Sequence, residues 1–303
     1  MNMTAFNDRE SMIGALVRAM PYIQRYRGKT FVLQVDGPFC ADAAAQKEVA
    51  EQIAVLMGLG IRVAMVHGPG PQVDYLSDRL NLSGRFIDGQ RVTDDVALDL
   101  QMMVCAGMIN VGMISAFRGA GIRPVGITGI DGGLITARQR NRHPTVNLSP
   151  EKDLIGEITE VNTAILTTLM DGGFMPLICP LSSDAHGQVL SLEAGEVSAA
   201  VAGALSAEKL ILLTELPGLC ENPDDPESVI SYIDLAGLEA LRMRRSIFGA
   251  MQRRIQASAL AIQSGVKRVH MVGYRPAGSI LGEIFTNDGT GTLIVADTTA
   301  ALD

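Results

Sequence analysis

Short apolar stretches alternate with amphipathic, helix-like stretches along most of the chain, and this alternation limits the folds that the chain can adopt. Each apolar stretch is bounded by Gly, Pro or Asp, which is typical of a buried strand. The expected strands are residues 31–35, 62–66, 124–128, 175–179, 209–214 and 268–272. The expected helices are residues 43–59, 94–119, 162–172, 197–205 and 249–265. This order predicts an α/β fold, a three-layer αβα sandwich with a mainly parallel central sheet, whose ligands lie at the carboxyl ends of the strands.

Two of these strands run directly into glycine-rich turns, within residues 31–37 and 64–70. Such turns suit a phosphate group, because glycine lets backbone N–H groups approach the anion, but a Lys or Arg usually balances its charge. The first turn instead carries the neutral Gln34 and the acidic Asp36, which weakens the case for a phosphate site. At the end of the second strand, His67 is expected to be a hydrogen-bonded core histidine rather than a general base.

The polar stretch 134–161 departs from the alternation and predicts a hairpin or loop excursion. It divides an expected N-terminal lobe, about residues 29–180, from a C-terminal lobe, about residues 181–303. Residues 220–229 contain Asn, Pro and Asp and predict a second surface loop.

Residues 1–28 precede the first strand and are expected to form an N-terminal helical arm. Apolar residues recur there at helical spacing, and Pro21 interrupts the pattern; they are Ile13, Leu16, Val17 and Met20. The sequence leaves open whether this arm packs on a neighbouring copy or on its own lobe.

The chain's 303 residues and 47% hydrophobic content suffice for a core that folds without disulfides or metal. The formal net charge is -8, and Lys and Arg do not cluster beside aromatic residues, which argues against a nucleic-acid partner. The densest basic run comprises Arg242, Arg244, Arg245, Arg253 and Arg254. Such a run beside a helix is typical of a solvated or inter-subunit face, with anion binding as the alternative.

Four cysteines, Cys40, Cys105, Cys179 and Cys220, are scattered without metal-binding spacing. They indicate reduced, mostly buried thiols in a cytoplasmic protein and argue against a metal site. The N-terminus has no signal-peptide pattern, and we expect no apolar stretch long enough to cross a bilayer, hence no membrane association.

Several motifs follow one another in a fixed order along the chain. They are MPYI at 20–23, RGKTFV at 27–32, VHGPGPQ at 66–72, GRF at 84–86, GQRVTD at 89–94, DGGLI at 131–135, AEKLILLT at 207–214, EIFT at 283–286 and GTGT at 289–292. In this order they resemble the amino acid kinase superfamily, specifically N-acetylglutamate kinases and, more closely, the kinase-like domain of bacterial N-acetylglutamate synthases. The resemblance covers nearly the whole chain and implies an amino-acid kinase or carbamate kinase-like fold with two lobes.

The resemblance implies a reaction in which ATP phosphorylates the side-chain carboxylate of N-acetyl-L-glutamate. Catalysis in such enzymes depends on positioning and on neutralising the transferring phosphoryl group. The family uses two lysines, a glycine turn and an aspartate for this purpose, and the matching positions here are Gln34, Arg254, Asp36 and Gly195. Because this charge pattern is lost, no kinase turnover is expected, and ATP with Mg²⁺ is expected only if the chain is a kinase after all.

The resemblance also places parts of the substrate site at Gly68, Gly70, Arg91 and Ser191. Arg91 has the fork geometry that grips a carboxylate bidentately. The alternative is that the two glycines only shape a turn while Arg91 makes a structural ion pair.

An effector site for L-arginine, found between the arm and the C-terminal lobe in arginine-sensitive members, is the better-preserved site. Its matching positions are Tyr22, Lys209, His270, Glu283, Gly289 and Gly291. A carboxylate such as Glu283 suits a guanidinium group, and the N–H groups of a glycine turn suit an α-carboxylate. The alternative is that Glu283 caps or pairs within a helix and the glycines only make a turn.

These points favour a catalytically impaired, kinase-fold regulatory domain of arginine biosynthesis that binds L-arginine and forms homo-oligomers through its arm. N-acetyl-L-glutamate is the other expected ligand. In the synthases an acetyltransferase domain follows, and because no residues remain for one here, we expect it on a separate subunit or on a longer chain. The alternative is an active N-acetylglutamate kinase. Dinucleotide binding at residues 68–70 is disfavoured, because Val73 stands where the third glycine is needed.

Overall fold

The computed structural model describes residues 3–82, 86–87, 90–140, 153–222, 225–243, 249–286 and 289–297, with side chains from residue 13 onward except those of 83–91. The main strands are β1 (Thr30–Val35), β2 (Arg62–His67), β5 (Pro124–Thr128), β8 (Met175–Cys179), β11 (Lys209–Thr214), β12 (Tyr232–Asp234), β13 (Val269–Gly273) and β14 (Thr292–Val295). They form one eight-stranded sheet in the order β12-β14-β13-β11-β1-β2-β8-β5. Neighbouring strands are parallel except for the antiparallel pair β13 and β14.

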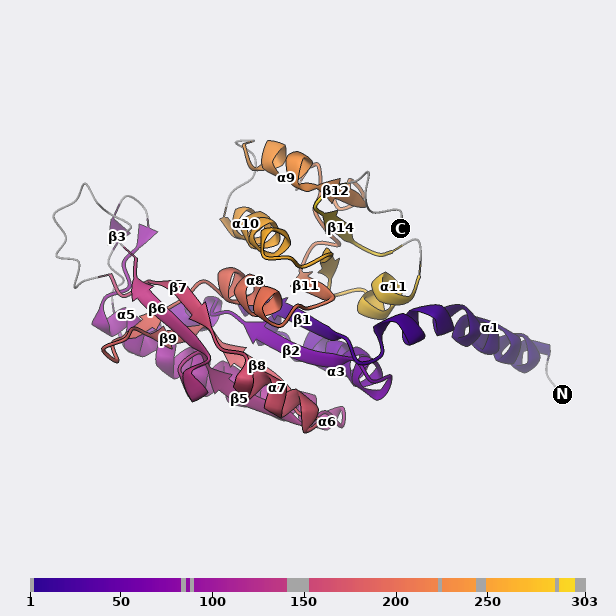
Figure 1. Cartoon of the computed structure of the whole chain (residues 1–303), viewed down its shortest axis with the longest axis horizontal. Coiled ribbons are helices and arrows are strands. Elements are labelled where there is room, and N and C mark those ends of the chain that lie inside the picture. The colour runs from indigo at the N-terminus through magenta and orange to yellow at the C-terminus, as the bar shows by residue number, and fades with distance from the viewer. Residues whose placement is uncertain are drawn as a thin grey trace.

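Helices cover both faces of this sheet, as Figure 1 shows for α3 and α6 on one side and α8 and α10 on the other. One face carries α3 (Ala43–Gly58), α6 (Asn110–Gly119) and α11 (Ser279–Phe285). The other carries α7 (Ala164–Asp171), α8 (Ala194–Ala204) and α10 (Gly249–Gln263). Along β1, Phe31 and Leu33 point into the first layer and Val32 into the second. The predicted three-layer sandwich with a mainly parallel sheet is confirmed.

Aspartates begin several helices, because a carboxylate satisfies the N–H groups that a first helical turn leaves free. Asp42 accepts hydrogen bonds from the backbone N–H groups of Ala44 and Ala45 at the start of α3. Asp94 and Asp234 do the same for α5 (Asp95–Gln101) and α9 (Leu235–Arg242). The remaining short helices are α2 (Gly37–Ala41), α4 (Pro71–Arg79) and a 3₁₀ turn at Asp131–Gly133.

A smaller sheet of four strands flanks the main one. It contains β6 (Ile135–Gln139), β7 (Gly156–Val161), β9 (Leu181–Ser183) and β10 (Val189–Ser191), in the order β10-β9-β6-β7. The antiparallel pairing of β6 and β7 confirms the predicted hairpin, while residues 141–152 lie outside the described part. A separate pair, β3 (Phe86–Ile87) and β4 (Gln90–Arg91), completes the strands. The sequence did not indicate β9, β10 or β12, since each has only three residues.

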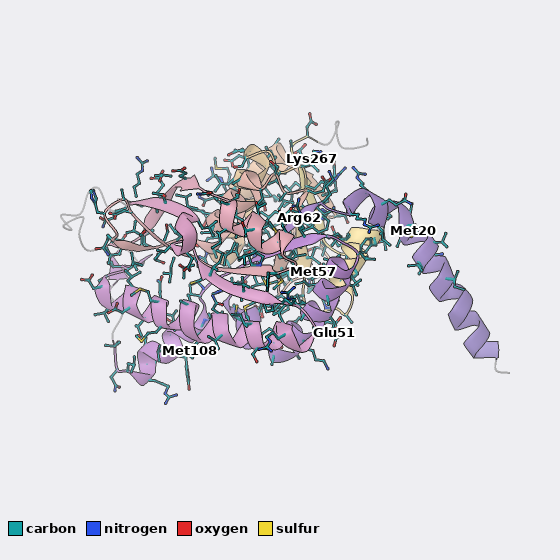
Figure 2. All side chains as sticks on the ribbon, turned by 60° about the horizontal axis from the view of Figure 1, so that its bottom comes forward. Met20, Glu51, Met57, Arg62, Met108 and Lys267 are labelled. Atoms are coloured by element: carbon teal, nitrogen blue, oxygen red, sulfur yellow. The ribbon has the colours of Figure 1, made fainter. Side chains whose placement is uncertain are left out.

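The arm is one continuous helix, α1 (Met3–Tyr26), so the expected interruption at Pro21 is wrong. A proline removes one backbone donor, and here the helix continues for another five residues after it. Figure 1 shows α1 projecting from the body, and it contacts the body through α11. Its apolar side chains at Ile13, Leu16, Val17 and Met20 are exposed, and Figure 2 labels Met20 on this projecting helix.

One helical stretch, Asp95–Gly119, is long and apolar enough to cross a membrane by length and composition, so the expectation that no such stretch exists is wrong. The stretch comprises α5, a π-helical segment (Met102–Ile109) and α6. Its inner side chains, among them Val104 and Phe117, are fully buried in the layer that also contains α3. Its outer side chains include Met108, which Figure 2 shows at the periphery.

Candidate functional site

The two glycine turns at the ends of β1 and β2 pack against each other backbone to backbone. A Cβ atom on Gly37 would lie 2.2 Å from the Cα of Gly70, and one on Gly70 would lie 2.5 Å from the Cα of Gly37. Only glycine fits at both positions, because no side chain can occupy that space. The turns therefore hold the ends of β1 and β2 together at the edge where parallel sheets bind ligands.

A cavity of about 320 Å³ opens at this edge, and we call it the strand-end pocket. It is lined by the ends of β1 and β2, by the start of α8 and by one side of α10. Its lining includes Gln34, Asp36, Gly68, Pro69, Gln101, Ser191, Glu193, Ala194, Gly195, Arg253 and Arg254. The structure thus brings Gln34, Asp36, Gly68, Ser191, Gly195 and Arg254 together, as the resemblance implied. Only the backbone of Arg91, within β4, is described.

Asp36 and Arg254, which the resemblance places at the family's phosphate-binding positions, pair with each other. Arg254, on α10, donates a hydrogen bond to Oδ2 of Asp36, and we call these two residues the charge pair. Their side chains are 14% and 22% exposed, respectively. The position of Arg254 shows that at least this part of the basic run does not form a solvated face. Arg242 does lie on the surface, where it pairs with Glu239, while Arg244 and Arg245 lie outside the described residues.

Gln34 is buried and directs its side chain toward the backbone. Its amide donates a hydrogen bond from Nε2 to the carbonyl oxygen of Val35 at 3.0 Å. A lysine at this position would bring a charge toward the pocket, whereas the amide is neutral. This wall of the pocket therefore supplies no cation.

Gly195 has a packing role at the start of α8. A Cβ atom there would lie 3.0 Å from the Cβ of Ala257 on α10, which is closer than almost all real contacts. Gly195, where the resemblance expects an aspartate, thus lets α8 approach α10 closely. The first turn of α8 nevertheless faces the pocket at Ala194 and Gly195, and Glu193 does not cap it with its side chain.

Several residues that line the pocket were not singled out from the sequence as site residues, and Gln101 and Arg253 are the two with polar contacts that matter here. Gln101, at the end of α5, accepts a hydrogen bond from the hydroxyl of Ser191. Arg253 lies 3.8 Å from Glu193, and both side chains are about half exposed. The adjacent arginines on α10 could have indicated Arg253, but no sequence signal marks Gln101, since it reaches the pocket only through tertiary packing.

His67 is fully buried at the end of β2, and neither of its ring nitrogens has a hydrogen-bond partner within the described part of the chain. The expectation of a hydrogen-bonded core histidine is therefore wrong. Burial lowers the pKa of His67 to about 4, so the ring is neutral near pH 7.

The second cavity, about 360 Å³, lies between the arm and the C-terminal part of the sheet, and we call it the arm pocket. It is lined by Tyr22, Arg25, Tyr26, Lys209, Ser231, Tyr232, Arg268, His270, Glu283, Ile284, Thr286, Gly289, Gly291 and Leu293. All six residues that the resemblance assigns to an effector site line this cavity. Binding of L-arginine stays a prediction at this point.

Three buried residues form a hydrogen-bonded chain in the arm pocket, and we call them the buried triad. Lys209 Nζ lies 2.8 Å from His270 Nε2, and His270 Nδ1 lies 2.6 Å from Glu283 Oε1. The carboxylate of Glu283 can only accept, so His270 donates through Nδ1 and accepts from Lys209 through Nε2. Glu283 Oε2 accepts two further hydrogen bonds, from the backbone N–H groups of Thr290 at 2.6 Å and Gly291 at 2.9 Å.

Glu283 and the glycine turn contact each other in this structure, while their role in binding L-arginine stays a prediction. Both oxygens of Glu283 are already engaged, and the N–H group of Gly291 serves this carboxylate rather than a ligand. Gly289 has φ +62°, and a Cβ atom on Gly291 would lie 2.1 Å from the carbonyl oxygen of Met271. The glycines therefore let the turn wrap around Glu283, so the alternative of a structural turn describes their observed contacts.

Burial and hydrogen bonds together set the protonation states of the buried triad. Burial, followed by the charge of Arg268, lowers the pKa of Lys209 to about 7. Burial, followed by the charge of Lys209, lowers the pKa of His270 to about 4. Burial alone would raise the pKa of Glu283, but hydrogen bonds from His270 and from the turn lower it to about 2. At neutral pH, Glu283 is therefore ionised and His270 is neutral, while the pKa of Lys209 lies far below its usual value.

Comparisons with known proteins agree with this architecture. The sequence pattern of the amino acid kinase family matches residues 29–273. The chain is 37% identical over 289 residues to an acetylglutamate kinase of Myxococcus xanthus, covering 93% of this chain and 94% of that protein. It is 37% identical over 282 residues to an acetylglutamate kinase of Carboxydothermus hydrogenoformans (92% and 96% covered) and 34% identical over 279 residues to the chloroplastic acetylglutamate kinase of Arabidopsis thaliana (92% and 79% covered).

Solved structures give a complementary similarity. The N-acetylglutamate synthase of Neisseria gonorrhoeae complexed with coenzyme A and N-acetyl-glutamate matches with a TM-score of 0.79 and 28% identity. The same synthase with coenzyme A and L-arginine matches with a TM-score of 0.77 and 26% identity. In the first match the chain covers 94% of its own length but only 64% of the synthase chain. The extent of the kinase matches favours the kinase interpretation over that of a regulatory domain.

Proposed function

This chain belongs to the amino acid kinase family, and we propose that it is an N-acetylglutamate kinase, which transfers a phosphoryl group from ATP to the side-chain carboxylate of N-acetyl-L-glutamate. The observation that carries this proposal is the similarity to acetylglutamate kinases over at least 92% of the chain. The strand-end pocket supports it, because it lies at the carboxyl ends of β1 and β2, where α/β folds bind their ligands.

The phosphoryl group is held, in this proposal, by the first turn of α8 and by α10. The start of α8 at Ala194 and Gly195 offers free N–H groups and the positive end of a helix dipole. Arg254 offers a guanidinium, which binds phosphate oxygens well once it is freed from Asp36. The carboxylate acceptor is assigned to the polar wall formed by Ser191 and Gln101.

The charges of the pocket imply a slow enzyme. Asp36 and Glu193 balance Arg253 and Arg254, so the described lining carries no net positive charge for a nucleotide phosphate with its Mg²⁺. Losing one preorganised stabilising group typically lowers the rate by about 10² to 10³-fold. We therefore expect turnover well below that of a relative with two lysines in this pocket.

The direct test incubates the purified chain with MgATP and N-acetyl-L-glutamate and traps the acyl phosphate with hydroxylamine. We expect product that depends on both substrates, and a loss of about 10²-fold in kcat for Arg254→Met. Arg242→Met is the matched control, because Arg242 pairs with Glu239 on the surface of α9. ATP hydrolysis that does not depend on N-acetyl-L-glutamate, or no acyl phosphate at all, would contradict the proposal.

A second candidate function is a catalytically impaired regulator that responds to L-arginine. The charge pair and the neutral Gln34 favour it, because they remove the cations of the phosphoryl site. The arm pocket also favours it, since six residues at the family's effector positions line one cavity. The similarity to a synthase solved with coenzyme A and L-arginine is consistent with this function.

Calorimetry with L-arginine separates the two candidates. The regulator predicts arginine binding together with no acyl phosphate formation, and Tyr22→Ala should weaken that binding because Tyr22 closes the arm side of the cavity. Tyr75→Ala, at an exposed tyrosine on α4 outside the cavity, is the control. Absence of binding at millimolar L-arginine would exclude the regulatory candidate.

We also propose that the arm joins copies of this chain. Exposed apolar side chains at Leu16, Val17 and Met20 on a helix that projects from the body are typical of an interaction surface. Light scattering should show an oligomer that Leu16→Glu with Val17→Glu reduces in size. A monomeric parent chain would contradict this assembly. An acetyltransferase partner can be sought by mixing the chain with a separately produced acetyltransferase domain in the same measurement.

A further inference from the structure

The charge pair joins two distant parts of the chain within the strand-end pocket. Asp36 directly follows β1, whereas Arg254 lies on α10, 218 residues later. Both side chains line the cavity that also contains the first turn of α8. The guanidinium that a nucleotide phosphate would need is therefore already bound to a carboxylate of the same chain.

The pair is incompletely satisfied. Oδ1 of Asp36 is buried and has no hydrogen-bond partner among the described residues, so only Oδ2 is paired. Asp36 stands at the N-cap position of α2, yet its side chain does not cap that helix. A buried carboxylate oxygen without a donor costs free energy, because the group has lost water and gained nothing at that atom. Such a contact is easier to break than a fully hydrogen-bonded one.

We propose that the charge pair is an autoinhibitory latch, in which Asp36 occupies Arg254 until a nucleotide phosphate displaces it. This inference rests on the proposed kinase function and adds a regulatory role at the same pocket. A phosphate group carries more charge than a carboxylate and accepts a bidentate guanidinium, so it competes well for Arg254 once it enters.

Neutralising Asp36 while keeping its shape tests the latch. In Asp36→Asn, we expect MgATP to bind at least about tenfold more tightly than in the parent chain, as when a charged hydrogen bond no longer competes. The measurement is equilibrium displacement of a fluorescent ATP analogue by MgATP. Glu239→Gln, which removes the carboxylate from the exposed pair with Arg242, is the matched control and should change nothing.

In this proposal, the gain in MgATP affinity caused by Asp36→Asn depends on Arg254. The double variant Asp36→Asn with Arg254→Gln should bind MgATP no more tightly than Arg254→Gln alone, and circular dichroism of each variant checks that it is folded. An affinity within twofold of the parent in folded Asp36→Asn, or a gain that persists without Arg254, would overturn the latch.

The acyl phosphate assay on the same variants distinguishes this inference from the proposed function. Tighter MgATP binding in Asp36→Asn without any acyl phosphate would support the latch and contradict the kinase. Acyl phosphate from the parent chain with unchanged affinity in Asp36→Asn would support the kinase and contradict the latch.

Discussion

The strand-end pocket and the arm pocket both place a carboxylate beside basic groups, but they satisfy it to different degrees. In the arm pocket, both oxygens of Glu283 accept hydrogen bonds, and the turn at Gly289 and Gly291 is shaped to supply them. In the strand-end pocket, only one oxygen of Asp36 has a partner among the described residues. A fully satisfied polar network fixes one conformation, whereas a partly satisfied one leaves a contact that a ligand can replace. The hydrogen bonds of Glu283 are thus preformed, whereas the contact between Asp36 and Arg254 is one that a ligand can replace.

The largest expected effect concerns Glu283 and its preformed hydrogen bonds. Glu283→Ala removes the acceptor of His270 and of two backbone N–H groups, and leaves them buried without partners. We expect a loss of at least about 3 kcal/mol in the free energy of unfolding, because each buried donor left without an acceptor costs about 1 to 3 kcal/mol. Urea unfolding at pH 7.5 measures it. A loss below about 1 kcal/mol would show that the buried triad is no more rigid than the charge pair.

The next effect compares two buried histidines with lowered pKa values: His67, which has no partner among the described residues, and His270, which has two. A histidine whose folded pKa of about 4 lies below its unfolded value of 6.5 takes up protons on unfolding, so stability falls as the pH drops from 6.5 toward 4. His67→Leu should remove roughly 2 kcal/mol of this acid sensitivity between pH 8 and pH 5 and cost little at pH 8. His270→Leu should instead destabilise at both pH values, because Lys209 and Glu283 lose their shared partner. Urea unfolding at pH 8 and pH 5 distinguishes the two variants. An equal change in stability with pH for both would contradict the predicted difference between His67 and His270.

A smaller effect concerns the glycine turns that frame the strand-end pocket. Gly70→Ala would place a Cβ atom 2.5 Å from the Cα of Gly37, so the two turns must move apart. We expect a loss of about 1 to 3 kcal/mol in stability, the range for overpacking, together with weaker ligand binding. Gly119→Ala, in a helix with open space at that position, is the control. Unchanged stability in thermal unfolding of Gly70→Ala would show that the turns are not in contact in solution.

The smallest expected effect is on the charge pair itself. Asp36→Asn keeps a hydrogen-bond acceptor for Arg254 and removes a buried carboxylate oxygen that has no donor among the described residues. We expect the free energy of unfolding to change by less than about 1 kcal/mol, in contrast to Glu283→Ala. The same urea experiment measures both. A loss comparable to that of Glu283→Ala would mean that the pair is structural and not exchangeable.

Much of the fold was predictable, because the hydrophobic period and the length of each segment are local properties of the sequence. The strand at Lys209–Thr214 and the helix at Ala43–Gly58 fall within a residue of their expected bounds. Short strands such as Val189–Ser191 were missed, since three residues carry no measurable period. The continuity of α1 through Pro21 was also missed, because a single lost donor is tolerated when the rest of the helix holds.

The candidate sites were predictable as sets of residues but not as contacts. Motif order brought Lys209, His270 and Glu283 into one site, yet it could not show that they bond to one another. His67 was expected to be an ordinary core histidine, and its lack of partners among the described residues depends on what surrounds it in three dimensions.

The sequence by itself determined the layered fold and the glycine turns at the ends of two strands, and its resemblance to the kinase family implied that the family's lysines and aspartate are replaced at Gln34, Arg254 and Gly195. These follow from residue type and spacing, which are fixed along the chain. Only the tertiary structure decided that Asp36 and Arg254, 218 residues apart, neutralise each other, and that Glu283 is already satisfied. Proximity in space determines which groups pair electrostatically or by hydrogen bonds, and burial determines how strong each interaction is.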